Sequence, residues 1–302
     1  MSNSNSIELQ YTGTYSLGTS VTFAAEAAFI RPVLQQSAGA EAVFDLAVLI
    51  DSSWAPVGVR LEQRGEHLTA RVAVNLEQIP NDDVRAQLER MLSLDVDGVP
   101  LASIAARDAE AADLINRFPG VRPVLYASPY EAAAKAIIMH RISRRQAASI
   151  ASRLSEDHGS VLERDGNTMY AFPAPKKLAA LSTVPGLSER KIEQLRLLGV
   201  AVQDSDFTAA HLRSMTPGDS QAYLQQLAGI GPFSAELIQI RGVGDADFFP
   251  RTELSLHRSM ATAYHLGEDP ALDVLESRAE QWRPYRSWIG LLFRHLAEGA
   301  PT

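Results

Sequence analysis

The chain has 302 residues, of which 46% are hydrophobic and 21% are charged. This composition is that of a globular protein, and the length suits about two domains. The absence of cysteine excludes structural disulfides, cysteine-ligated zinc and cysteine-held iron–sulfur clusters. The seven histidines are scattered without the spacing of a metal site, so we expect no metal and no cofactor.

We expect a cytoplasmic, monomeric protein without a membrane partner. The first ten residues lack the basic segment and apolar run of a secretion signal, and no stretch approaches the roughly 18 apolar residues of a membrane span. The formal net charge of −8 argues against a broad basic surface that binds nucleic acid. Oriented backbone amides can nevertheless hold a phosphate without basic side chains.

Residues 1–97 are predicted to form a mixed α/β domain. Strand-like composition covers three stretches, 7–15, 42–50 and 57–74, the last as two alternating strands around the turn Arg64-Gly65. The alanine-rich stretch 20–31 favours a helix. A second helix begins near Asn81, because Val84, Leu88, Met91 and Leu92 recur at helical spacing.

Residues 98–302 are predicted to form an almost purely helical domain, so the fold class is α+β. Ser128-Pro129-Tyr130-Glu131 is a helix start, with serine as N-cap and proline in the first turn. Ser143-Arg-Arg-Gln146 repeats this capping pattern. Further helices are expected at about 176–182, 188–198, 219–227, 232–241, 253–266, 269–280 and 284–298.

Two segments of the helical part resemble each other. Each has an apolar residue, a glycine-centred turn and then a helix, at 184–195 and at 227–238. In the second copy Gly229 and Gly231 flank Ile230, and Pro232 suits the first position of the next helix. Such a turn can hold one phosphate with backbone amides and the helix dipole. A plain structural turn buried by Ile230 is the alternative, at about even odds.

A carboxylate follows the hairpin at the start of another helix. It lies in Phe248-Phe-Pro-Arg-Thr-Glu253-Leu-Ser-Leu-His-Arg258, where Leu254, Leu256 and Met260 are the apolar helical positions. Taken alone, an acid at a helix start is most often a favourable partner of the helix dipole.

The order of these elements resembles the helix-hairpin-helix DNA glycosylase superfamily: glycine-rich hairpin, helix, Phe/Pro turn, then an acid. Gln281-Trp-Arg-Pro-Tyr-Arg-Ser-Trp288 is similar to the C-terminal signature of the AlkA-type branch. Segments 118–123 and 130–140 look like the opening helices of that branch, and the mixed α/β front matches its N-terminal domain. The resemblance spans nearly the whole chain and is strongest over 118–299.

The resemblance implies a protein that binds duplex DNA containing damaged bases and flips the damaged nucleotide into a cleft. Glu253 would be the catalytic carboxylate that stabilises the oxocarbenium-like sugar. Two sets of site residues follow. The DNA-binding set is Gly229, Ile230, Gly231, Phe233 and Ser234; the base pocket and wedge set is Phe233, Leu237, Leu254, Pro123, Leu125 and His140.

The family also distinguishes two kinds of enzyme by one position. Bifunctional members, which also nick the strand, carry a nucleophilic lysine two residues after the last hairpin glycine. That position is Phe233 here, so a monofunctional enzyme is expected.

The sequence departs from the family at two features. The acid is glutamate where the family has aspartate, and a displacement of about an ångström can cost about a hundredfold in rate. Of four family aromatic positions, aligned to Phe233, Leu237, Leu254 and Arg294, only the first keeps a ring. Two hypotheses therefore stand: a monofunctional glycosylase for alkylated bases, favoured about two to one, or a catalytically weak DNA-binding relative.

Other conspicuous side chains favour structural roles. Trp282, Tyr285 and Trp288 are expected to pack the last helices, and His257 is expected to be an ordinary structural histidine. Arg141, Arg144 and Arg145 form a basic cluster that either contacts phosphate or is simply solvated.

Overall fold

The computed structural model describes residues 6–26, 33–35, 42–75, 77–164, 166–203 and 205–299. Its first part is built on an antiparallel sheet with strand order β1-β5-β4-β3-β2. The strands are β1 (Ser6–Leu9), β2 (Val33–Gln35), β3 (Ala42–Leu49), β4 (Pro56–Arg64) and β5 (His67–Asn75). The strands predicted at 42–50 and 57–74 are confirmed, whereas the one predicted at 7–15 ends at Leu9.

Two helices pack on this sheet, α1 (Leu17–Glu26) and α2 (Asn81–Met91). Val59 and Leu61 of β4 are fully buried against side chains such as Val21, Val84 and Leu88. This burial of alternating strand positions against amphipathic helices explains the predicted patterns. The helix predicted at 20–31 begins earlier, at Leu17, and 27–31 lie outside the described residues.

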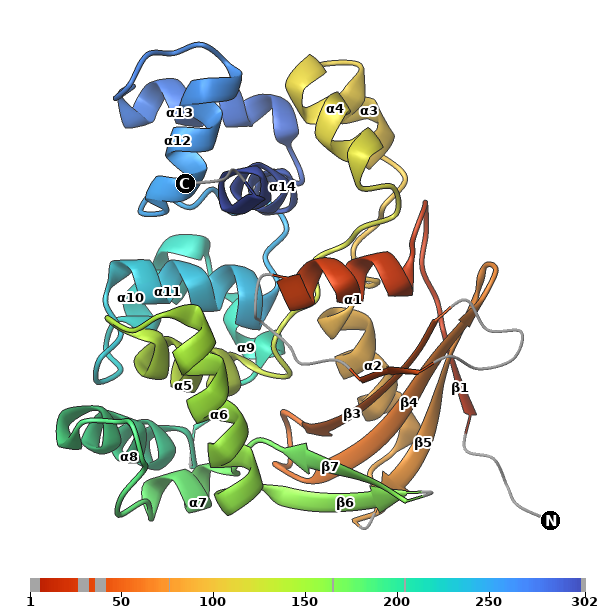
Figure 1. Ribbon diagram of the computed structural model, residues 1–302, viewed down its shortest axis with the longest axis vertical. Coiled ribbons are helices and arrows are strands. Elements are labelled where there is room, and N and C mark those ends of the chain that lie inside the picture. The colour runs from red at the N-terminus through yellow and green to blue at the C-terminus, as the bar shows by residue number, and fades with distance from the viewer. Residues whose placement is uncertain are drawn as a thin grey trace.

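The second part is mainly helical (Figure 1). Both predicted caps are confirmed: Ser128 Oγ accepts from Glu131 N at 3.0 Å, and Ser143 Oγ accepts from Gln146 N at 3.2 Å. The helices are α3 (Leu101–Ala105), α4 (Ala109–Arg117), α5 (Pro129–Met139), α6 (Arg144–His158), α7 (Pro175–Ala179), α8 (Glu189–Gln203), α9 (Ala209–Ser214), α10 (Pro217–Leu224), α11 (Pro232–Ile238), α12 (Leu254–Ala263), α13 (Leu272–Ala279) and α14 (Arg286–Gly299). A π-helical turn, η1 (Gln239–Val243), extends α11, and a 3₁₀ turn, η2 (Glu280–Trp282), precedes α14.

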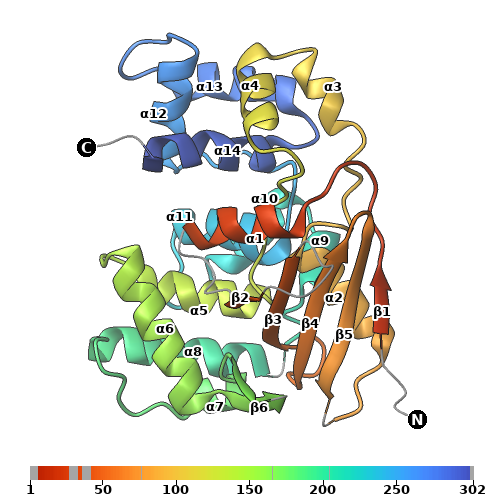
Figure 2. The ribbon, with the colours of Figure 1, turned by 45° about the vertical axis from the view of Figure 1, so that its right-hand side comes forward.

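A β-hairpin interrupts the part that was expected to be almost purely helical. Strands β6 (Ser160–Arg164) and β7 (Asn167–Ala171) pair with each other, and β7 lies against β3 of the sheet (Figure 1). Figure 2 shows β6 near the end of the sheet. The methyl of Met169 reaches Gly58, where an added Cβ would lie 3.0 Å away. The expectation of an almost purely helical second part is therefore wrong here, although an Asp-Gly turn signal stands at 165–166 in the sequence.

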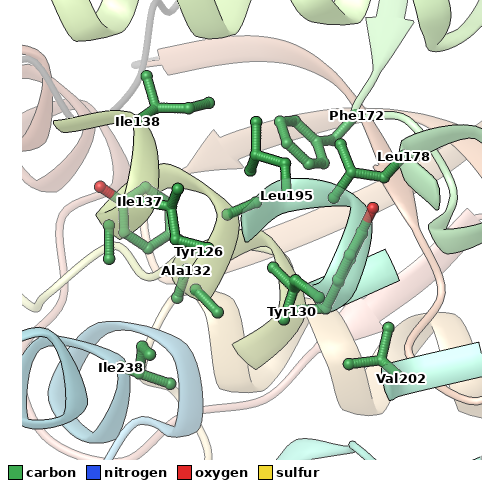
Figure 3. Packing of buried hydrophobic residues seen from close by; sticks show 14 of the residues in the cluster. Tyr126, Tyr130, Ala132, Ile137, Ile138, Phe172, Leu178, Leu195, Val202 and Ile238 are labelled. Carbon is green, nitrogen blue, oxygen red and sulfur yellow. The ribbon is translucent and has the colours of Figure 1, made fainter. Parts of the chain in front are cut away.

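The helices form two hydrophobic clusters. The first joins α5–α8 with α9, α10 and α11, and Figure 3 shows Tyr130, Leu195 and Ile238 among its buried side chains. The second joins α12–α14 with α3 and α4, which come from much earlier in the chain. Trp282, Tyr285 and Trp288 belong to this second cluster and are buried, which confirms their packing role. Among the described residues, no helix is long and apolar enough to cross a membrane.

Candidate active site

Figure 1 shows α11 on one side of the boundary between the two helical clusters, and α12 and α14 on the other. Residues of these three helices line a small pocket. Its cavity is about 50 Å³, which is room for a few water molecules. The lining combines apolar side chains with two carboxylates and two guanidinium groups. These residues are Phe233, Glu236, Leu237, Ile240, Arg241, Pro250, Glu253, Leu256, Ser287, Gly290, Leu291 and Arg294.

Glu253 is the N-cap of α12 and stands at the pocket wall. Its carboxylate accepts from Ser255 Oγ at 2.5 Å and from Ser255 N at 3.3 Å. Its side chain is only 19% exposed, so the carboxylate is held by the helix start and faces little water. A carboxylate in this setting can stabilise a cation that forms beside it.

Arg294 of α14 approaches Glu253 from across the pocket, with Nη1 3.7 Å from Oε2. Its side chain is 10% exposed, so both charges are largely removed from solvent. Such a pair keeps two opposite charges balanced in a partly dry site. The negative charge of Glu253 is therefore balanced by Arg294.

A second carboxylate, Glu236 of α11, holds the segment that leads to Glu253. It is 6% exposed and accepts from Thr252 N at 2.9 Å and from Thr252 Oγ1 at 2.5 Å. The N–H of Arg251 is a third donor, at 3.2 Å. Sequence reasoning missed this residue, although an acid within the apolar stretch 235–238 was a signal that it faces a polar partner.

The hairpin turn has the predicted geometry. Ile230 N donates to Leu227 O at 3.1 Å, Gly229 has φ +85°, and Ile230 is buried. Gly231 is the N-cap of α11 and has no side chain to cap its first turn. The amides of Phe233 and Ser234 lie in that first turn, where helical N–H groups lack intrahelical acceptors. The turn can therefore present backbone donors to an anion.

The first copy of the motif repeats this turn. Leu187 N donates to Val184 O at 3.0 Å, and Gly186 has φ +91°. The internal resemblance between 184–195 and 227–238 is therefore a structural repeat. Ser188 lies where Gly231 lies in the second copy, and its Oγ accepts from Lys191 N at 3.4 Å.

The predicted pocket residues are only partly brought together. Phe233 and Leu237 line the pocket, with Phe233 half exposed at its mouth. Leu254 is 62% exposed beside Glu253, so it is not one of the core positions of its helix, whereas Leu256 and Met260 are. Leu254 stays a predicted contact for a ligand.

The predicted wedge residues do not reach the surface. Pro123 and Leu125 are buried in the segment before α5, so neither presents a side chain to a duplex in this conformation. His140 is exposed at the C-terminal end of α5 and does not line the pocket. The wedge remains a prediction, and the geometry does not favour it.

The remaining singled-out residues lie around the site. His257 Nε2 is 3.0 Å from Pro250 O, and its ring stacks on Phe249. It therefore supports the turn before Glu253, as an ordinary structural histidine does. Arg141 lies between α5 and α6, and Arg144 and Arg145 begin α6; all three are exposed, and a phosphate contact there remains a prediction.

A larger cavity, of about 430 Å³, lies between β3, α5, α6 and β7. Its wall contains Lys135, whose Nζ is 2.5 Å from Glu131 Oε1 and 4.6 Å from the ring centroid of Tyr126. Burial by itself would lower the pKa of Lys135. The attraction of Glu131 and Tyr126 together outweighs this effect, so the pKa of Lys135 is raised. Glu253, the acid expected from the order of hairpin, helix and acid, lines the smaller pocket and not this cavity.

No family model matches the chain. Over 205 residues it is 28% identical to a Mycobacterium tuberculosis protein named "Probable bifunctional transcriptional activator/DNA repair enzyme AlkA", covering 67% of this chain and 40% of the relative. Over 188 residues it is 27% identical to DNA-3-methyladenine glycosylase 2 of Escherichia coli, covering 60% of this chain and 62% of the relative. The chain thus spans less than two thirds of these relatives.

The solved 3-methyladenine DNA glycosylase of Archaeoglobus fulgidus has the same fold, with a TM-score of 0.78, 24% identity and 97% of each chain covered. The chain is thus similar in sequence to DNA glycosylases of the AlkA type and shares the fold of an archaeal one. Within this AlkA-type fold the expected order of hairpin, helix and acid places Glu253 in the pocket beside α11.

Two departures from the AlkA-type pattern meet in the same pocket. The resemblance predicts that Glu253 stands where the family has aspartate, and Arg294 where it has an aromatic residue. Arg294 Nη1 lies 3.7 Å from Glu253 Oε2, a pairing that cannot be read from the sequence.

Proposed function

We propose that this protein is a monofunctional DNA glycosylase that excises alkylated bases, of the 3-methyladenine type, from duplex DNA. The observation that carries the proposal is the position of Glu253, a shielded carboxylate at a pocket wall one helix away from the glycine hairpin. The names of the relatives, a DNA repair enzyme and a DNA-3-methyladenine glycosylase, point the same way.

In the proposed reaction the damaged nucleotide leaves the stack and enters the cleft between the helical clusters. The N-glycosidic bond then breaks, the alkylated base leaves with the bonding electron pair, and the carboxylate of Glu253 stabilises the positive charge that develops on the sugar. A water molecule adds to C1′ and loses a proton, which gives the abasic site. The pocket has room for only a few water molecules, so its mouth must open to admit a base. Phe233, half exposed there, offers a ring on which a base can stack.

Binding to the duplex is assigned to the hairpin. The amides at the start of α11 would hold one phosphate. Gly231 would allow the DNA backbone to approach closely, because no atom lies within 4 Å of the position that a Cβ would take there. This mode needs no basic side chains, which reconciles DNA binding with a net charge of −8. Because Phe233 occupies the position of the lysine nucleophile, the product would be an abasic site in an intact strand.

One observation favours a second candidate, a catalytically weak DNA-binding protein. Arg294 places a cation beside Glu253, and a fixed positive charge there opposes the positive charge of the reacting sugar. The two candidates differ in one measurable quantity, the rate of base release at saturating protein.

The test is release of free bases from randomly methylated duplex DNA, with wild type compared with Glu253→Gln. We expect wild type to release methylated bases, and Glu253→Gln to lose at least about a hundredfold in rate, since removing one stabilising group at a charged transition state costs 10²–10³. Glu268→Gln, at an exposed position, is the matched control and should keep the wild-type rate.

The outcomes separate the candidates. No release by wild type at high protein concentration, with duplex binding intact, would favour the DNA-binding protein. Equal rates for wild type and Glu253→Gln would remove Glu253 from the reaction. Strand nicking without added alkali would contradict the monofunctional assignment.

A further inference from the structure

Helix α11 contacts both halves of the proposed site. Its N-terminal turn carries the hairpin residues Gly231 and Phe233, and one turn further along it carries Glu236. Glu236 is buried, and its side chain points to the segment that ends at Glu253. One short rigid element therefore connects the surface that would hold DNA with the carboxylate that would act on it.

The contacts of Glu236 fall on the two residues that immediately precede Glu253. Oε1 accepts from Arg251 N, and Oε2 accepts from both Thr252 N and Thr252 Oγ1. Hydrogen bonds to a charged acceptor are about twice as strong as neutral ones, and two backbone amides fix a direction as well as a distance. The carboxylate thus sets the backbone path into the N-cap of α12.

These same contacts argue against other roles for Glu236. Three donors occupy its two oxygens, so it is not poised to take a proton from water. Its neighbour Arg251 does not pair with it, because the guanidinium contacts Glu276, with Nε 2.8 Å from Oε1. A buried carboxylate whose donors come from one turn is suited to hold that turn in place.

We infer that Glu236 is a positioning residue: it fixes the turn 251–252 and so holds the Glu253 carboxylate at the reacting sugar. This inference rests on the proposed function of Glu253. Misplacement of a reacting group by about an ångström can cost about a hundredfold in rate. Loss of Glu236 should therefore slow the chemical step and leave the affinity for DNA unchanged.

The test compares Glu236→Gln, Thr252→Val and Thr252→Ser with wild type in single-turnover base release and in duplex binding. In Glu236→Gln an amide NH₂ must face one of the three donors, so we expect a rate loss of about a hundredfold. Thr252→Val removes only the hydroxyl contact and should lose about tenfold, whereas Thr252→Ser should restore most of the rate. All three should bind the duplex within about twofold of wild type.

Two further variants separate positioning from general destabilisation. Asp108→Asn is the matched control, because Asp108 is also a buried carboxylate with three donors, Tyr264 OH, Trp282 Nε1 and Ala111 N. It should lower the melting temperature and leave the rate unchanged. In the Glu253→Gln background, Glu236→Gln should add less than about a twofold loss, because it acts through the missing group.

A crystal structure of Glu236→Gln gives a readout that does not depend on activity. We expect the Glu253 carboxylate to move by about an ångström or more, with α11 in place. Unchanged positions of residues 251–253 would overturn the inference whether or not the wild type releases bases. A wild type without activity, together with a displaced Glu253 in the variant, would overturn the proposed function alone. A full loss that persists in the Glu253→Gln background would also overturn the positioning role.

Discussion

The guanidinium of Arg294, on α14, lies 3.7 Å from the carboxylate of Glu253, at the start of α12. Glutamate reaches this arginine while it still accepts the Ser255 amide at the helix N-terminus. The extra methylene relative to aspartate is therefore used: it carries the carboxylate from the helix cap towards the pocket.

We predict that Glu253→Asp lowers single-turnover base release by about a hundredfold, because the carboxylate withdraws by about an ångström. Aspartate is itself a good N-cap, so the free energy of unfolding should change by less than about 1 kcal/mol. Rapid-quench kinetics and urea denaturation measure the two quantities. A Glu253→Asp variant that releases bases faster than wild type would contradict this prediction, and would mean that aspartate suits the reaction better than glutamate does.

The two hairpin glycines should respond differently to alanine. Gly231 has φ −97° and open space around its Cβ direction, so Gly231→Ala should change stability by less than about 1 kcal/mol. Its methyl group would occupy the space into which a phosphate approaches, and we expect affinity for duplex DNA to fall about tenfold or more. Fluorescence anisotropy with a labelled duplex measures this loss.

Gly229→Ala is the contrasting variant. Gly229 has φ +85°, and an added Cβ would lie 2.6 Å from the side chain of Gln194. We expect a loss of about 1–2 kcal/mol or more from the left-handed backbone alone, seen in urea denaturation. Unchanged DNA affinity in Gly231→Ala would contradict the phosphate role, whatever Gly229→Ala does.

Arg90 connects the sheet and its helices to the helical part of the protein, at η1 and at the segment before α5. This arginine of α2 is buried and donates to the carbonyl of Gly242 at 2.6 Å, to that of Tyr126 at 3.4 Å and to that of Ala127. Arg90→Met leaves these carbonyls without a donor, and we predict a loss of about 3–5 kcal/mol in the free energy of unfolding. Arg85→Met, on an exposed face of the same helix, should cost less than about 0.5 kcal/mol. Similar losses in the two variants would contradict this role.

Asp51 should make stability depend on pH. Burial raises its pKa, although Arg90 and the N–H of Ala209 oppose the shift. The folded state therefore holds the proton more tightly than the unfolded state. The stabilisation is complete below the usual aspartate value of about 3.9 and is lost as the pH rises through the folded pKa.

Asp51→Asn removes this titration, and its amide oxygen can still accept from Ala209 N, a bond of 3.0 Å in the wild type. We expect the free energy of unfolding of the variant, relative to wild type, to be higher at pH 7 than at pH 4. Urea denaturation at the two pH values measures the difference. Asp269→Asn, at an exposed position, is the control, and an equal offset of Asp51→Asn at both values would contradict the prediction.

Local patterns explain what could be predicted from the sequence. Serine caps followed by proline or glutamine mark the starts of α5 and α6, and the glycine turn at 229–231 is defined by backbone conformation alone. Missed features had weaker local signals. The β6–β7 hairpin is short and packs against β3 and Gly58 of the sheet, a contact that helix periodicity does not predict.

The sequence by itself determined the order of hairpin, helix and acid, since glycine, proline and capping residues act on their nearest neighbours. Only the tertiary structure decided which side chains share the pocket. Glu236 and Thr252 are 16 positions apart, and Arg294 is 41 positions from Glu253. Their contacts exist because α11, α12 and α14 bury their apolar faces together. The hydrophobic effect has no preferred direction, so the angles between these helices are set by the packing of their side chains. Glu253 could be singled out from the sequence, but its contact with Arg294 and the contacts of Glu236 with the preceding turn could not.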